Sequence, residues 1–207
     1  MLIILVLLTS IISYGQEINN KLMGKVIILD SGHGGKDKGT SSNGIYESDI
    51  NLNIVLKLRD ELVKQGVEVI LTRDGDYDLS SPNVSRRKKS DFDNRIKLIN
   101  ESNADLYISI HMNYLSESQY YGAQVFYTEG NEQLAKIMQS SFGEELKSPR
   151  SEKKLIDSIY MYKQLKIPGI LIECGFLSNA KERDLLNSDE YQDEIVKTII
   201  TGLIKYY

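Results

Sequence analysis

The sequence is poor in the residues that brace small domains covalently or divide chains into modules. Among 207 residues it has one cysteine, Cys174, three prolines and no tryptophan. A single cysteine excludes an internal disulfide, so stability must come from a hydrophobic core. The apolar residues just before Cys174 predict a buried, inert thiol. No proline-rich or Gly/Ser-rich linker divides the chain and no internal repeat is visible, which favours one domain.

Positive charge is also in short supply. The chain carries 25 Lys and Arg residues against 29 Asp and Glu residues, a net charge of -4. Nucleic-acid binders usually present a basic surface, so this balance argues against nucleic acid as a partner. Apolar residues at 41% and charged residues at 26% are ordinary for a folded globular protein.

Long hydrophobic runs are absent except at the N-terminus. Residues 2–12 (LIILVLLTSII) form an apolar run about as long as the core of a signal peptide, and too short to span a bilayer comfortably. Ser13 and Gly15 are small residues at the positions that a signal peptidase reads, which predicts cleavage before Gln16. No Lys or Arg precedes the run, so a retained N-terminal anchor stays the alternative.

The chain is therefore expected to have three parts. Residues 1–15 are a signal peptide or N-terminal anchor, residues 16–24 a short linker, and residues 25–207 the folded domain. We expect export across the cytoplasmic membrane, with membrane contact only through an uncleaved N-terminal segment.

Hydrophobic patterning predicts strands that alternate with helices. Runs rich in apolar residues predict strands at 25–30, 67–72, 105–110, 122–128 and 169–173. Spacings of three and four predict helices at 48–65, 91–101, 132–146 and 190–204, with a polar loop at 73–90. This order predicts an α/β fold, a single domain with a mostly parallel twisted sheet flanked by helices.

Three side chains with catalytic potential coincide with strand ends. His33 and His111 follow the ends of two expected strands, and Glu173 ends a third. In open α/β sheets the ligand site lies at the carboxyl ends of the strands. These are the chain's only two histidines, so a shared site is more probable than two unrelated core histidines.

Imidazole and carboxylate ligands suit zinc, and a catalytic zinc keeps three protein ligands plus water. Two histidines therefore call for a carboxylate as the third ligand. Glu47, at the start of the first expected helix, is the best candidate. The alternative for Glu47 is an acid that only interacts with the dipole at the helix N-terminus.

Four segments in order resemble the signature blocks of zinc-dependent N-acetylmuramoyl-L-alanine amidases of the amidase_3 type. They are residues 30–37 (DSGHGGKD), 47–49 (ESD), 108–113 (ISIHMN) and 172–179 (IECGFLSN). One block alone would be weak, because a glycine-rich turn can also bind phosphate. Ser31, Ser48 and Tyr114 depart from the residues usual in the family, but none of these departures removes a ligand.

The resemblance implies that residues 25–207 are a zinc amidase catalytic domain. His33, Glu47 and His111 would bind one Zn2+ per chain, and Glu173 would be the catalytic acid/base. The alternative for Glu173 is a strand-end carboxylate paired with a lysine. Asn113 would orient a ligand or contact the substrate, although an ordinary loop asparagine fits its position equally well.

The implied reaction is hydrolysis of the amide between N-acetylmuramic acid and L-alanine, which makes peptidoglycan the substrate. Residues 85–95 (SRRKKSDFDNR) and 166–169 (KIPG) further resemble the germination-specific amidases of spore formers. That likeness implies action on spore-cortex peptidoglycan as a step toward muramic δ-lactam. It also implies a protein that is secreted or associated with the cell wall or forespore.

The basic residues 86–89 in this segment are either a solvated charged loop or a contact for anionic stem peptides or a protein partner. A need for an accessory protein stays open. Two other functions remain: a zinc peptidase that cuts within the stem peptide, and a non-catalytic peptidoglycan-binding or regulatory domain. An intact set of His33, Glu47, His111 and Glu173 argues against the second.

Overall fold

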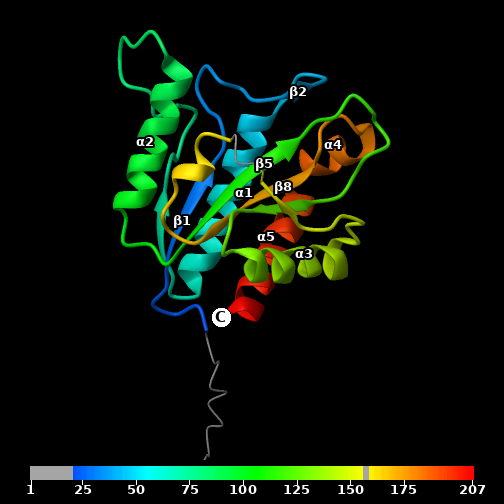
Figure 1. Cartoon of the computed structure of the whole chain (residues 1–207). Helices are drawn as coiled ribbons and strands as arrows, with labels where there is room; N and C mark the ends of the chain where they lie inside the picture. Colours follow the sequence, from blue (N-terminus) through cyan, green and yellow to red (C-terminus); the bar gives the residue numbers. More distant parts are fainter. Residues whose placement is uncertain (1–20, 156–158) are drawn as a thin grey trace, which may run out of the picture.

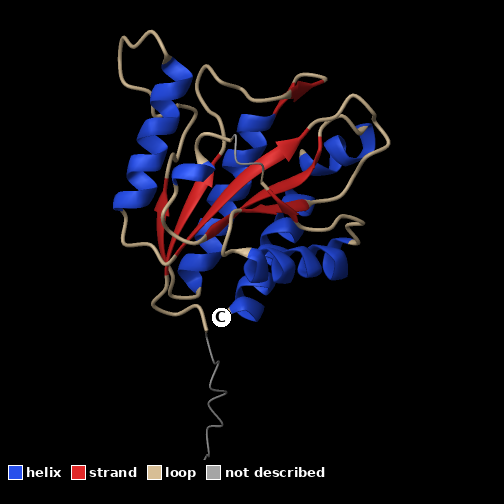
Figure 2. Ribbon diagram, in the orientation of Figure 1, coloured by secondary structure: helices blue, strands red, loops and turns tan. Residues whose placement is uncertain are grey.

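The computed structural model describes residues 21–155 and 159–207, which form a central sheet with helices on both faces (Figures 1 and 2). The expected signal peptide or anchor, residues 1–15, lies outside the described residues. Within the described ranges, no helix combines the length and apolarity needed to cross a bilayer.

The main sheet of the described chain is six-stranded and mostly parallel. Across the sheet the strands are β4 (Glu68–Leu71), β1 (Val26–Ser31), β5 (Leu106–Asn113), β8 (Gly169–Phe176), β6 (Gln124–Tyr127) and β7 (Lys153–Lys154). Strands β4, β1, β5 and β8 pair in parallel, and β6 runs antiparallel to β8. The predicted fold class, an α/β domain with a mostly parallel sheet, is confirmed.

One face of the sheet is covered by α1 (Glu47–Lys64), α3 (Glu132–Leu146) and α5 (Asp189–Tyr206). Because side chains alternate along a strand, every second residue of β1, β5 and β8 points to this face. These residues are aliphatic and fully buried: Ile27, Leu29, Ile108, Ile110, Ile170 and Ile172. They form the main hydrophobic core.

The other face carries α2 (Arg87–Glu101) and the short 3-10 helix η1 (Tyr162–Gln164). The intervening residues of the same strands point here. Ile28, Tyr107 and Leu171 form a smaller apolar cluster under α2. One step nearer the carboxyl ends of the strands, the residues on this face become polar, and the site is built there.

Helix α1 follows the predicted apolar spacing. Ile50, Ile54, Leu58 and Leu62 are all buried against the main core. The helix begins at Glu47, one residue before the expected start, so Glu47 lies in its first turn.

Helix α2 is longer than predicted. It begins at Arg87, so the expected polar loop 73–90 ends four residues early and most of the basic segment forms a helical turn. A hydrogen bond from the Ser90 N–H to the Arg86 carbonyl closes this turn. Lys and Arg are good helix formers, and for this reason the turn needs no apolar spacing of its own.

Strands β5 and β8 also extend beyond their predicted ends. The pairing runs from Tyr107 of β5 opposite Gly169 of β8 to Asn113 opposite Phe176. The register shifts after His111. His111 and Glu173 therefore lie inside their strands, directly paired, rather than at or past the ends as expected.

Several short elements were not predicted. These are α4 (Ala180–Leu186), β7 and the hairpin β2 (Ser41–Ser42) with β3 (Ile45–Tyr46). Helix α4 carries a recognisable start signal, because the Asn179 side chain accepts a hydrogen bond from the Glu182 backbone N–H.

Candidate active site

His33 is placed by a tight glycine-rich turn after β1. His33 itself has a positive φ of 61°, a conformation that costs a non-glycine residue energy and is typical of functional turns. A Cβ on the preceding Gly32 would come within 2.3 Å of the His111 ring. Glycine at position 32 therefore allows the turn and the second imidazole to share one small space.

Glu47 lies between the two histidines. Its Oε1 is 3.2 Å from His33 Nε2 and 2.9 Å from His111 Nδ1. Its other oxygen, Oε2, accepts a hydrogen bond of 2.8 Å from the Thr40 backbone N–H, which fixes the carboxylate plane. Glu47 is 4% exposed, so it is far more than a surface acid at a helix start.

His33, Glu47 and His111 have the geometry of a metal site. One ligand atom from each lies within 4.8 Å of the others, from an irregular turn, a helix start and a strand. Two imidazoles and one carboxylate are a donor set that zinc accepts in catalytic sites. The residues present therefore fit zinc, as the sequence predicts.

The outer nitrogen of His33 also has a partner. Its Nδ1 lies 3.1 Å from Asp37 Oδ1, an arrangement that orients many metal-binding imidazoles. Although burial lowers the pKa of His33, hydrogen bonds to Asp37 and Glu47 raise it to about 9. Without a metal, the site thus holds a proton on His33 at neutral pH.

Glu173 stands beside His111 on the neighbouring strand, facing the same side of the sheet. Its Oε2 is buried and has no hydrogen-bond partner among the described residues. Burial raises the pKa of Glu173 to about 7, while the imidazole of His111 opposes this shift. Among the described residues no lysine forms an ion pair with Glu173, which argues against a lysine-paired carboxylate.

The candidate site lies at a cavity of about 230 Å³. His33, His111 and Glu173 line one side of it, and Phe92 and Met161 belong to an apolar wall. A carboxyl group with a pKa near neutrality in such a pocket can both accept and donate a proton, which is the property of a general acid/base.

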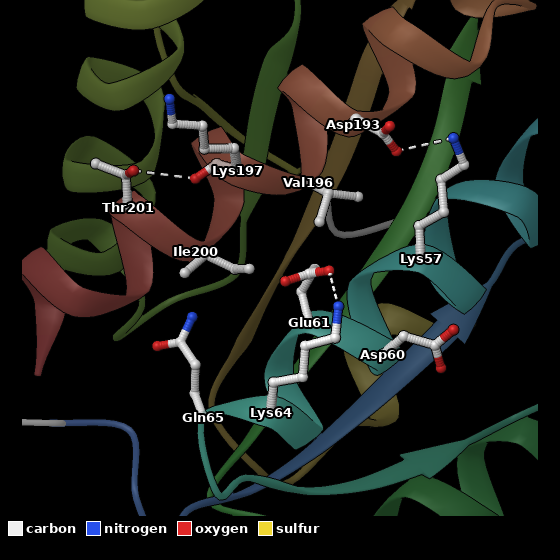
Figure 3. Close-up of a pocket in the computed structure, with 10 residues that line it drawn as sticks. All are labelled: Lys57, Asp60, Glu61, Lys64, Gln65, Asp193, Val196, Lys197, Ile200 and Thr201. Carbon is white, nitrogen blue, oxygen red and sulfur yellow. Dashed lines mark hydrogen bonds and ion pairs between the residues drawn. The ribbon is translucent and has the colours of Figure 1, made fainter.

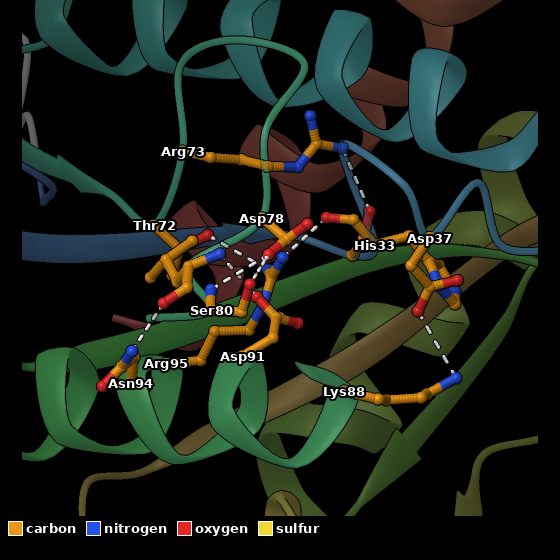
Figure 4. Close-up of polar contacts among 12 residues, drawn as sticks. His33, Asp37, Thr72, Arg73, Asp78, Ser80, Lys88, Asp91, Asn94 and Arg95 are labelled. Atoms are coloured by element: carbon orange, nitrogen blue, oxygen red, sulfur yellow. Dashed lines mark hydrogen bonds and ion pairs between the residues drawn. The ribbon is translucent and has the colours of Figure 1, made fainter. Parts of the chain in front are cut away.

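Beneath the cavity, Arg95 of α2 connects the helix to the turn that carries His33 (Figure 4). Its Nη1 donates to Asp30 Oδ1 at 2.6 Å and to the Ser31 carbonyl at 2.8 Å, and its Nη2 donates to the His33 carbonyl at 2.6 Å. Its Nε pairs with Asp91, four residues earlier on the helix. Arg95 is 2% exposed, so the whole guanidinium is buried.

Arg73, after β4, supports the same turn from the other side (Figure 4). Its guanidinium donates to the carbonyls of Ser31, Gly32, Ser48 and Gly75 at 2.7–3.0 Å. These bonds tie the turn of His33 to the first turn of α1, which carries Glu47. The two arginines thus hold two of the metal-ligand elements in register.

Asp30 is the negative centre of this buried network. Burial alone would raise its pKa, but Arg95 and the hydroxyls of Ser109 and Thr72 hold the pKa below its ordinary value. The ion pair with Arg95 is nearly inaccessible to water, so removing one partner would leave an uncompensated buried charge.

Arg73, Arg95 and Ser109 were not among the site residues predicted from the sequence. Asp30 stood at the edge of a signature block, and the spacing of Asp91 and Arg95 by four residues was a usable signal of a helical ion pair. Neither observation indicates burial, because an identical pair on the surface has the same spacing.

Asn113 and the basic segment occupy less decisive positions. The Asn113 side-chain oxygen accepts a hydrogen bond from the Tyr114 N–H, as in an ordinary turn. Within the basic segment, Lys88 lies 3.4 Å from Asp37 and Lys89 lies 2.7 Å from Asp93. Contact of Asn113 or of these lysines with substrate stays a prediction.

A larger hollow of about 550 Å³ lies between α1 and α5 (Figure 3). Lys57, Glu61, Lys64, Asp193 and Lys197 are among its lining residues. None of the candidate site residues lines it. Lys57 pairs with Asp193 and Lys64 with Glu61 along the helix surfaces, so this hollow does not compete with the histidine cavity as the site of chemistry.

Comparison with known proteins supports this assignment. The model of the N-acetylmuramoyl-L-alanine amidase family (Amidase_3) matches residues 27–205. The germination-specific N-acetylmuramoyl-L-alanine amidase of Bacillus subtilis is 42% identical over 192 residues, which cover 90% of this chain and 81% of that protein.

Solved structures give the same result. The CwlD amidase from Clostridioides difficile, solved in complex with the GerS lipoprotein, matches with a TM-score of 0.83 and 42% identity, covering 88% of this chain and 98% of that one. An N-acetylmuramoyl-L-alanine amidase from Clostridium difficile 630 matches with a TM-score of 0.78 and 31% identity, covering 88% and 96%. The predicted family and enzyme class are confirmed: the chain belongs to the N-acetylmuramoyl-L-alanine amidase family.

Proposed function

We propose that this chain uses zinc to hydrolyse the amide between N-acetylmuramic acid and the first L-alanine of the peptidoglycan stem peptide. The observation that carries the proposal is the convergence of His33, Glu47 and His111 around one point, with Glu173 lining the same cavity as the two histidines. Membership of the amidase family supports the reaction.

His33, Glu47 and His111 would hold the metal. Zinc in such a site supplies Lewis acidity, which acidifies water and polarises an amide carbonyl. Glu173 would take the proton of the attacking water on its buried carboxylate and pass it to the departing alanine nitrogen. A pKa raised toward neutrality suits a group that must serve as base and then as acid.

The apolar wall next to Glu173 supports a dry site. Phe92 and Met161 line the cavity on the side of α2 and η1. Excluding bulk water from this side would strengthen every charge interaction around the scissile bond. Asn113 remains a candidate contact for the glycan or the peptide.

We further propose spore-cortex peptidoglycan as the natural substrate. The support is the 42% identity to a germination-specific amidase. Removal of the stem peptide frees the lactyl carboxyl of muramic acid, which a later step can close into the δ-lactam. Work on this polymer requires export, for which the apolar run at residues 2–12 is the expected signal or anchor.

An accessory protein is part of the proposal. The related amidase from Clostridioides difficile was solved in complex with the GerS lipoprotein. We propose that this chain also works with an extracytoplasmic partner, for which the exposed lysines of the basic segment are a candidate contact.

The test is a digest of purified cortex peptidoglycan by protein that has been stripped of metal and then reloaded with zinc. We expect mass spectrometry to find free peptides that begin with L-alanine and muramic acid without a peptide, only in the reloaded sample. Fragments cut inside the peptide would identify a zinc peptidase. Zinc binding without any cleavage, with and without partner, would favour a binding or regulatory domain.

A further inference from the structure

We propose that Tyr162 fixes the tautomer of His111. Its hydroxyl is the last link before His111 in a buried hydrogen-bond chain that begins at Asp30 and passes through Ser109. Tyr162 acts as a positioning residue in this account, because it works through His111. The inference rests on the proposed zinc site and adds to it which nitrogen of His111 faces the metal.

The chain of bonds is continuous. Ser109 Oγ lies 2.6 Å from Asp30 Oδ2 and 3.0 Å from the Tyr162 hydroxyl. The Tyr162 hydroxyl lies 3.3 Å from His111 Nε2. Asp30, Ser109 and Tyr162 are 1%, 0% and 8% exposed, so water does not compete for these bonds.

The direction of each bond follows from the charge on Asp30. Its carboxylate is ionised, because it is paired with Arg95 at 2.6 Å, and it can only accept. Ser109 therefore donates its one hydroxyl proton to Asp30 and must accept a hydrogen bond from Tyr162. Tyr162 donates its own hydroxyl proton to Ser109, so its oxygen can only accept from His111.

His111 must consequently carry its ring proton on Nε2. With a metal bound, its Nδ1 would present a lone pair to the point where the ligands converge, next to Glu47 Oε1 at 2.9 Å. A hydrogen-bond partner on the remote nitrogen is the usual device that sets which imidazole nitrogen binds a metal.

His33 uses the opposite nitrogens. Its Nδ1 faces Asp37 at 3.1 Å, and its Nε2 faces Glu47 at 3.2 Å. One histidine is therefore oriented directly by a partly buried carboxylate, and the other through two hydroxyls by a fully buried carboxylate. The structure thus assigns Nε2 of His33 and Nδ1 of His111 to the metal.

The fold explains how residues so distant in sequence meet. Asp30 and Ser109 are register partners on β1 and β5, and His111 is two residues further along the same face of β5. Helix η1 then lays Tyr162 over this face, in the smaller apolar cluster. The chain of bonds thus needs both the sheet register and the packing of η1.

The experiment uses protein labelled with 15N-histidine, because the chain's two histidines give a simple spectrum. In the zinc-loaded wild type, long-range 1H–15N correlation should show His111 protonated on Nε2 and His33 protonated on Nδ1. Tyr162→Phe removes the acceptor, so the His111 Nε2 proton should exchange faster and zinc affinity should fall about 10- to 100-fold.

Ser109→Ala is the more discriminating variant. It frees the Tyr162 hydroxyl proton, which can then point at His111 Nε2 and favour the opposite tautomer in metal-free protein. A role of Tyr162 in packing alone predicts no such change. Tyr160→Phe is the matched control, since Tyr160 is 40% exposed and bonds Asp93 on the surface; it should leave spectrum and zinc affinity unchanged.

Three results would overturn the proposal: His111 protonated on Nδ1 in the zinc-loaded wild type, no change of spectrum and affinity in both Tyr162→Phe and Ser109→Ala, or equal losses in Tyr160→Phe. Thermal melting identifies any variant that fails to fold, in which case the other variant decides. Absence of zinc binding in the wild type would instead refute the proposed function, while the presence or absence of a proton on Nε2 of metal-free His111 would still test the chain of bonds.

Discussion

The two faces of the central sheet differ in what they bury. The face under α1, α3 and α5 buries aliphatic side chains, such as Ile108 and Ile172. The opposite face, under α2 and η1, buries ions and hydroxyls near the strand ends, among them Asp30, Arg95 and Ser109. The same strands supply both sets by alternation, so a single residue step separates the core from the site.

The two faces should therefore respond differently to substitution. Aliphatic burial is non-directional and tolerates small changes of shape. A buried polar network is directional, and each missing partner leaves a group that has lost its water. Changes on the polar face should therefore affect metal binding and turnover as well as stability, whereas changes on the apolar face should affect stability alone.

The largest expected effect follows from removing a ligand on the polar face. His111→Ala should lose the bound zinc and all amidase activity, because only His33 and Glu47 remain of the three ligands. Cys174→Ala, next to Glu173 on β8 but facing the main core, should keep both. Metal analysis and amidase assays of the two variants provide the check; the reverse pattern would mean that the ligands are wrongly assigned.

The next effect concerns the buried ion pair. Arg95→Met should lower the free energy of unfolding by about 3–5 kcal/mol, because Asp30 and Asp91 would be buried without their counter-charge. Lys89→Met breaks an exposed pair with Asp93 on the same helix and should cost far less stability, because exposed ion pairs are screened by water. Urea unfolding of both variants measures the contrast, and equal losses would show that burial is not the cause.

A smaller effect concerns pH. The pKa of metal-free His33 is raised to about 9, so below this pH the zinc must displace a proton. Apparent zinc affinity should therefore rise about tenfold per pH unit on approach to that value and level off above it. Competition with a chelator of known pH dependence measures this, and an affinity independent of pH below the pKa would contradict it.

The smallest effect concerns the apolar face. Ile54→Val on α1 removes one methyl group from the main core and should lower the free energy of unfolding by about 0.5–1.5 kcal/mol. Zinc content and turnover should match those of the unchanged protein. A loss of zinc in this variant would show that the two faces are coupled more tightly than the geometry indicates.

The apolar face was largely predictable from the sequence. A spacing of four predicts α1 from Ile50, Ile54, Leu58 and Leu62. Continuous apolar runs predict β1 and β8. The ends of elements were predicted less well. Strand pairing extends β5 to Asn113, and such pairing depends on a partner far away in the sequence.

The polar face was predictable only where residue type limits the choice. Two histidines, and acids at a helix start and in a strand, marked the candidates, and the resemblance to the amidase family supplied their roles as ligands and acid/base. Tyr162 could not be found in this way, because tyrosine is common in this chain and nothing local marks this one. Its role follows from η1 lying over β5, which is a property of the folded chain.

We propose Glu173, on the polar face, as the acid/base of an amidase whose metal would be held by other residues. Glu173→Gln preserves side-chain shape and removes the basic oxygen. Zinc content, thermal melting and the rate of muramoyl-alanine cleavage should be measured side by side on both proteins. We expect the variant to keep its zinc content and to cleave the bond about a hundred- to ten-thousandfold more slowly. A rate within about threefold of the unchanged protein, or loss of the zinc, would contradict it.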